Sequence, residues 1–181
     1  MSDAARLLTA AELERLPDDD YRYELVEGRL VRMSPTGWEH GRIVARLLVR
    51  LNQYGESRKL GLAVTEVGFK LRSNPDTVRA PDVAFVRQER LPAEKLRGFW
   101  NGPPDLAVEV LSPADRPNEI RDKVEEYLSS GVLAVVVVDS DDTSVTTHRR
   151  LSPPVTARDD DELDLGDVVE GFRCAVPEIF G

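Results

Sequence analysis

The chain has 181 residues, of which 41% are hydrophobic and 31% charged, and its net charge is −9 at pH 7. This composition is typical of one soluble globular domain, and the single cysteine, Cys174, excludes an internal disulfide framework and a cysteine-rich zinc site. No apolar run approaches the roughly 20 residues of a membrane span, and the N-terminus lacks the apolar core of a signal peptide, so we expect a cytoplasmic protein.

The negative charge is unevenly distributed. From Asp139 to the end there are 11 acidic and 4 basic residues, a balance of −7, whereas the preceding residues have a balance of −2. The net charge argues against nucleic acid as a partner. Because residues 150–181 form an acidic C-terminal segment, a basic surface elsewhere in the chain is still compatible with this composition.

The first elements are a helix over residues 8–20 and a hairpin over residues 21–33. Thr9 followed by Glu12 is the pattern of a capping box at a helix start. In the hairpin, Glu27-Gly28 supplies the turn between two runs of alternating polarity.

A long helix is predicted from Trp38 to Tyr54, with Gly55 as its stop. One side of this helix is apolar, as expected of a face that packs on a core. His40 lies near its start and projects toward the apolar side. The apolar side consists of Ile43, Val44, Leu47, Leu48 and Leu51, and another side carries Arg42, Arg46 and Arg50.

The rest of the chain alternates strands and helices, which predicts an α/β (α+β) fold with a core over residues 62–149. The run Val132–Val138 is short and rich in β-branched residues, which is typical of a central strand. Together with Leu106–Leu111 and the intervening helix it predicts a βαβ unit with parallel strands. Strands are expected at 62–71, 82–86, 106–111, 132–138 and 144–149, a helix capped by Asn118 at 118–130, surface loops at Pro153-Pro154 and 159–162, and a strand and final turn within 168–180.

Two carboxylates lie in apolar runs, where burial of an ionised group costs free energy. Glu109 is embedded among apolar neighbours, and Asp82 opens its strand directly after Pro81. Burying an ionised carboxylate without a partner costs many kcal/mol, and two of them on neighbouring strands repel unless a cation or proton lies between them. Since oxygen ligands select hard cations, the pair predicts a site for Mg²⁺ or Mn²⁺.

Lys123 is the third candidate of this site. In the helix over 118–130 it lies at the edge of the apolar stripe that includes Tyr127. A lysine that leans toward Glu109 could position a water molecule or offset charge on a phosphoryl transition state.

These residues resemble the PD-(D/E)XK restriction-endonuclease-like superfamily and, more narrowly, its Uma-two family of endonucleases. Over nearly the whole chain, the order and spacing of the motifs carry the resemblance. One departure is Leu111, which occupies the position where the superfamily has its lysine. The matching motifs are Tyr23-Glu24-Leu25-Val26-Glu27-Gly28, His40, Pro81-Asp82-Val83, Val108-Glu109-Val110-Leu111-Ser112-Pro113, Lys123 with Tyr127, Gly131-Val132 and Val138-Asp139.

The resemblance implies a mixed central sheet flanked by helices and Mg²⁺-dependent hydrolysis of nucleic-acid phosphodiesters, with DNA as the expected substrate. It makes Asp82 and Glu109 metal ligands, and Lys123 the catalytic lysine supplied by the following helix. Glu24, His40 and Tyr127 match positions near the site. A homodimer would suit an enzyme that cuts both strands.

Simpler interpretations remain for each residue. Asp82 could merely start a strand, Glu109 could be a structural partner of Arg79 or Lys123, and Lys123 could extend over an apolar face toward solvent. Two other functions follow from these interpretations. One is a non-catalytic binding or assembly module that keeps the nuclease fold, and the other is a metal-dependent hydrolase of small phosphoesters.

Overall fold

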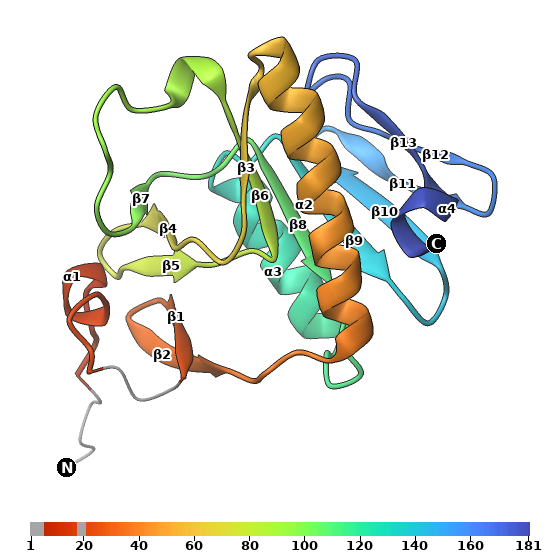
Figure 1. Ribbon diagram of the computed structural model, residues 1–181. Coiled ribbons are helices and arrows are strands. Elements are labelled where there is room, and N and C mark those ends of the chain that lie inside the picture. The colour runs from red at the N-terminus through yellow and green to blue at the C-terminus, as the bar shows by residue number, and fades with distance from the viewer. Residues whose placement is uncertain (1–5, 18–20) are drawn as a thin grey trace.

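The computed structural model describes residues 6–17 and 21–181, and in this part of the chain six strands form a mixed sheet (Figure 1). Its order is β11-β10-β9-β8-β6-β3, and β8 and β9 run parallel as the predicted βαβ unit requires. Both strands are central, which explains their continuous apolar sequences. The strands are β3 (Gly61–Val64), β6 (Val83–Arg87), β8 (Leu106–Val110), β9 (Ala134–Asp139), β10 (Ser144–Arg149) and β11 (Ser152–Arg158).

One long helix covers each face of this sheet. Helix α2 (Trp38–Arg58) lies in front of the sheet in Figure 1, and helix α3 (Pro117–Ser129) lies behind it. Alternate residues of β8 point to the two sides of the sheet. Leu106, Val108 and Val110 pack in the cluster of Ile43, Leu47 and Leu51, whereas Ala107 packs with Val124 and Tyr127. Glu109 therefore faces α3.

A second, five-stranded sheet has the order β2-β1-β5-β4-β7 and was not anticipated as a separate layer. The predicted hairpin forms its edge, and the turn residues Glu27 and Gly28 both have positive φ, 48° and 75°. Helix α1 (Ala10–Leu13) packs on β1 and β5. The strands are β1 (Arg22–Val26), β2 (Arg29–Met33), β4 (Phe69–Arg72), β5 (Thr77–Arg79) and β7 (Trp100–Asn101).

The first helix is shorter than predicted. The capping box of Thr9 and Glu12 is present, but the helix covers only Ala10–Leu13. Of the predicted helix, residues 18–20 lie outside the described residues.

The predicted strand over 62–71 is wrong, because this segment forms β3 and β4, which belong to different sheets. Glu66 has a left-handed backbone with φ of 58° between them. The Thr65 hydroxyl donates to the main-chain oxygen of Asp82 at 2.7 Å, and the Glu66 amide donates to that of Pro81 at 3.4 Å. Contacts with a later part of the chain thus redirect the backbone.

Two helix boundaries also differ from the prediction. Arg116 caps α3 in place of Asn118, because Pro117 at the first helical position has a φ already suited to a helix. Helix α2 continues past Gly55 and ends at a left-handed Lys59. Gly55 is instead a buried helical residue against Phe85.

The C-terminal segment contains more strand than predicted. Pro153 and Pro154 lie in β11 and not in a loop, because β11 is an edge strand with an irregular register there. Glu162 begins β12 (Glu162–Asp164), which pairs with β13 (Arg173–Ala175). The final turn is helix α4 (Val176–Phe180).

Gly55 and Gly41 provide a matched test of the packing of α2. A Cβ at Gly55 would lie 2.8 Å from Cε2 of Phe85 and 3.0 Å from the oxygen of Gly61, whereas no described atom lies within 4 Å of a Cβ at Gly41. Gly41→Ala should stabilise by up to about 1 kcal/mol through helix propensity. Gly55→Ala should instead destabilise by about 1–2 kcal/mol, because overcrowding outweighs that gain. Urea denaturation of both variants measures the difference, and a stabilised Gly55→Ala protein would contradict this packing.

Candidate active site

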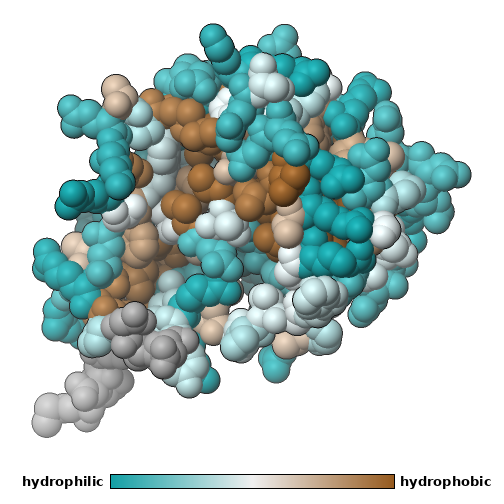
Figure 2. All heavy atoms as spheres, viewed as in Figure 1, coloured by the Kyte–Doolittle hydropathy of each residue, from teal (hydrophilic) through white to brown (hydrophobic). Residues whose placement is uncertain are grey.

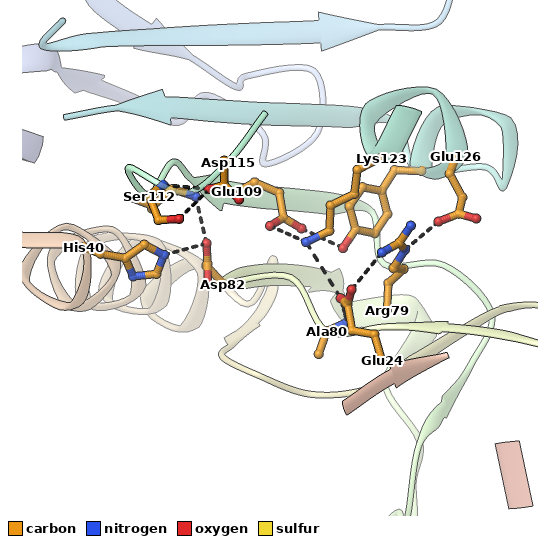
Figure 3. Close-up of polar contacts among 12 residues, drawn as sticks. Glu24, His40, Arg79, Ala80, Asp82, Glu109, Ser112, Asp115, Lys123 and Glu126 are labelled. Atoms are coloured by element: carbon orange, nitrogen blue, oxygen red, sulfur yellow. Dashed lines mark hydrogen bonds and ion pairs between the residues drawn. The ribbon is translucent and has the colours of Figure 1, made fainter. Parts of the chain in front are cut away.

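Asp82 directly precedes β6, which begins one residue later than the predicted strand, and Glu109 lies on β8, the strand that pairs with β6. Val83 pairs with Val108 in the antiparallel ladder of β6 and β8, so the ladder places Asp82 across from Glu109. The Val110 amide donates to Oδ2 of Asp82 at 2.8 Å, which fixes the carboxylate beside β8. Figure 3 shows the side chains of Asp82 and Glu109 in this part of the molecule. Two residues that are 27 positions apart in the sequence are thus brought together, as predicted.

Helix α3 supplies both partners of the Glu109 carboxylate. The Tyr127 hydroxyl donates to Oε1 at 2.8 Å, and Nζ of Lys123 donates to Oε2 at 2.7 Å. Lys123 and Tyr127 are four residues apart and therefore share one side of the helix. Of the two partners proposed for a structural Glu109, the structure selects Lys123 and not Arg79.

His40 reaches the same site from the N-terminal part of α2. Its Nε2 lies 3.1 Å from Oδ2 of Asp82, and its buried Nδ1 has no hydrogen-bond partner among the described residues. Burial lowers the pKa of His40, but the hydrogen bond and charge of Asp82 outweigh it, and the net pKa is raised. His40 is therefore a neighbour of Asp82 and not an isolated core histidine.

Glu24 brings the five-stranded sheet into contact with the site. It is 2% exposed and accepts hydrogen bonds from Nη1 of Arg79 at 2.8 Å and from the Ala80 amide at 2.9 Å. Its Oε1 lies 3.8 Å from Nζ of Lys123. Lys123 therefore lies between two buried carboxylates, Glu109 and Glu24.

The sequence did not predict the ion pair between Arg79 and Glu126 in this network. Nε of Arg79 donates to Oε2 of Glu126 at 2.5 Å, and Arg72 lies 3.7 Å from the other oxygen of Glu126. Arg79 thereby joins β5 to both β1 and α3. The available signals were weak: Arg79 stands just before Ala80-Pro81-Asp82, and Glu126 is one helical turn after Lys123.

Comparison with known proteins identifies the family. The model of the Uma2 family, described as "Putative restriction endonuclease", matches residues 10–177. The chain belongs to the Uma2 family. This confirms the predicted resemblance, and the site residues all lie within the matched range. None of the curated proteins matches the chain.

A solved structure supports the fold of this Uma2 protein. A protein of Anabaena variabilis ATCC 29413, described as a "putative nuclease belonging to DUF820", superimposes with a TM-score of 0.84. The match covers 96% of this chain and 97% of the other at 18% identity. The predicted α/β fold with a mixed sheet is therefore confirmed. In the described residues, no helix is long and apolar enough to cross a membrane.

The site of this Uma2 protein is electrostatically coupled. Burial raises the pKa of Glu109 to about 7, the Lys123 cation opposes the rise, and the charges of Asp82 and Glu24 add to it. Burial lowers the pKa of Lys123, but the carboxylates of Glu109 and Glu24 outweigh it and the net pKa is raised. Burial also raises the pKa of Tyr127, which keeps its hydroxyl a donor. Burial and the neighbouring carboxylates thus make the charged form of Glu109 costly, and a nearby cation would stabilise it.

The donor set fits a hard divalent cation. Asp82 and Glu109 supply carboxylate oxygens, the ligands that Mg²⁺ prefers, and Asp82 is close enough to raise the pKa of Glu109. Within the described residues, no group of three or more His, Cys, Asp and Glu side chains could hold a metal. A cation here would rely on two carboxylates and take its other ligands from water or substrate, which is usual for Mg²⁺.

Proposed function

We propose that this protein is a metal-dependent endonuclease that hydrolyses phosphodiester bonds in nucleic acid, with DNA as the expected substrate. The observation that carries this proposal is the placement of Asp82 opposite Glu109, with Nζ of Lys123 2.7 Å from Glu109. Burying several charged groups together destabilises the folded state. A catalytic role of these groups accounts for that cost. Membership of Uma2 supports the reaction class.

Asp82 and Glu109 would hold Mg²⁺ or Mn²⁺. When bound, such an ion polarises a phosphoryl oxygen and lowers the pKa of a water molecule. Lys123 would orient the attacking water or donate to the phosphoryl oxygens as charge develops. Its position between Glu109 and Glu24 keeps it protonated for this donor role.

The other residues of the site act through these three. His40 and the Val110 amide both contact Oδ2 of Asp82, which orients the carboxylate. Tyr127 fixes Oε1 of Glu109, and Glu24 lies beside Lys123. We propose that His40, Tyr127 and Glu24 position the catalytic groups.

Metal binding tests the central pair. Isothermal titration of Mn²⁺ should show saturable binding to the wild type and none to Asp82→Ala or Glu109→Ala, because each variant removes one of two carboxylate ligands. Asp122→Ala is the matched control, since this carboxylate on α3 is 73% exposed and should leave binding unchanged. Cleavage in Mg²⁺ of DNA, offered both as supercoiled plasmid and as a single-stranded circle, should follow the same pattern and stop in EDTA. Binding that is indifferent to both substitutions would reject the site.

A non-catalytic module that keeps this fold is the second candidate. Two observations favour it. Both Glu109 oxygens already accept hydrogen bonds, one from Lys123 and one from Tyr127, and the net charge of the chain is −9. Such a module would bind no Mn²⁺ and nick no DNA. A hydrolase of small phosphoesters would keep the metal site, but its turnover would lack the steep salt dependence of polyanion binding.

A further inference from the structure

The outer side of α2 carries a groove of about 820 Å³, which we call the α2 groove. This side faces the viewer in Figure 1, and Figure 2 shows hydrophobic and hydrophilic areas next to each other in this region. It is the side of the helix away from the buried Ile43, Leu47 and Leu51. The lining includes Trp38, Arg42, Ala45, Arg46, Val49 and Arg50.

Every charged residue that lines the α2 groove is an arginine, although the chain has a net charge of −9. Arg42 pairs with Glu39, Arg50 pairs with Glu178, and Arg46 donates to the main-chain oxygens of Glu178 and Gly181. The two acidic partners stand outside the lining and are about half exposed. Since partly exposed ion pairs of this kind contribute little to the free energy of unfolding, the arginines can exchange these partners for an anionic ligand at little cost.

Trp38 adds an aromatic surface to these cations. Its side chain is 87% exposed at the first position of α2, and Val49 at the other end of the groove is 49% exposed. Cations that follow a backbone and aromatic rings that stack on bases are the combination used to bind single-stranded nucleic acid. A second copy fits less well, because a two-fold contact through this groove would bring two rows of arginines together.

The Trp38 end of the α2 groove lies at the end of α2 that also carries His40, which lies 3.1 Å from Asp82. His40 itself projects from the buried side of the helix, because residues two positions apart do not share a face. From Trp38 to Arg50 the helix rises by about 18 Å, so a bound strand would contact the groove over several nucleotides. We infer that the α2 groove binds a nucleic-acid strand with unpaired bases. This inference rests on the proposed function and specifies its substrate as single-stranded.

Binding without cleavage tests the inference. The probe is a fluorescein-labelled 12-nucleotide single-stranded DNA, and its anisotropy is measured in EDTA at several salt concentrations. Trp38→Ala should weaken binding about tenfold through lost stacking. Arg46→Gln should lower the slope of log K against log salt by about 0.7. Arg58→Gln, on α2 but outside the groove, is the matched control and should change neither quantity.

Other results would overturn the inference. They are equal affinities of the wild type, Trp38→Ala and Arg46→Gln, tighter binding of a duplex of the same sequence, or no binding of either form. A dimer that Trp38→Ala dissociates in light scattering, with unchanged DNA affinity, would make the groove an interface between copies. Failure of the proposed function is distinct: the protein would bind single strands through the groove yet lack the Mn²⁺ site and cleave neither single-stranded nor plasmid DNA.

Discussion

Arg79→Met should lower the free energy of unfolding by about 3–5 kcal/mol, because it removes the cation that donates hydrogen bonds to two largely buried carboxylates and leaves each with only a more distant cation. The side chain of Arg79 is 14% exposed, and its partners Glu24 and Glu126 are 2% and 10% exposed. Burial alone would lower the pKa of Arg79, but the charges of Glu24 and Glu126 outweigh it and the net pKa is raised. Urea denaturation at neutral pH measures the loss.

A surface ion pair provides the control for this variant. Arg158 pairs with Asp142, and both side chains are about half exposed, so Arg158→Met should cost less than about 1 kcal/mol. Arg79→Lys should be intermediate, because an ammonium keeps the charge but lacks the planar fork that contacts Glu24 and Glu126 at once. Similar small losses for Arg79→Met and Arg158→Met would show that this network contributes little to stability.

The Arg79 network has a structural consequence for Lys123. Arg79 on β5 contacts Glu24 on β1 and Glu126 on α3, so it ties the five-stranded sheet to the helix that carries Lys123. Glu24 and Glu109 in turn flank Lys123 from two different sheets. The position of the lysine therefore depends on the docking of both sheets against α3.

Local patterns predicted much of this fold. The apolar stripe of α2, the β-branched run of β9 and the turn at Glu27-Gly28 each have one favourable local structure, and all three formed. The isolated carboxylates of Asp82 and Glu109 were visible for the same reason, since a charge inside an apolar run is conspicuous. Their proximity followed because β6 and β8 pair directly.

Long-range contacts decided what the sequence did not reveal. The break between β3 and β4 depends on Thr65 and Glu66 meeting Pro81 and Asp82, and no proline or turn motif marks it. The Arg79–Glu126 pair joins residues 47 positions apart. From the sequence alone, an arginine or a helical glutamate is expected to be exposed, because these residue types are rarely buried without a partner.

Lys123→Met should reduce DNA cleavage by about 10²- to 10⁴-fold, the range for a group that transfers a proton or stabilises developing charge. Lys95→Met is the control, since Lys95 is exposed and should leave the rate unchanged. Single-turnover nicking with saturating Mg²⁺ separates this loss from weaker metal binding. A rate within a few-fold of the wild type would assign Lys123 a structural role.

The same variant should move the pH dependence in a defined direction. The Lys123 cation lowers the pKa of Glu109, which burial raises to about 7, so its removal should raise that pKa further. In the metal-free protein, Glu109 should then become a carboxylate only in more alkaline solution.

Stability should follow the same titration. A carboxyl group with a raised folded-state pKa stabilises the fold fully below its ordinary pKa of about 4.5, and this contribution is lost as pH rises through about 7. In Lys123→Met this stabilising contribution should persist to higher pH before it is lost, because the folded-state pKa of Glu109 is raised further. Urea denaturation between pH 5 and 9 follows it, and Lys123→Met/Glu109→Gln should remove this additional pH dependence, since the variant carboxamide does not titrate. A stability difference between the wild type and Lys123→Met that is constant over this range would mean that Lys123 and Glu109 are not coupled.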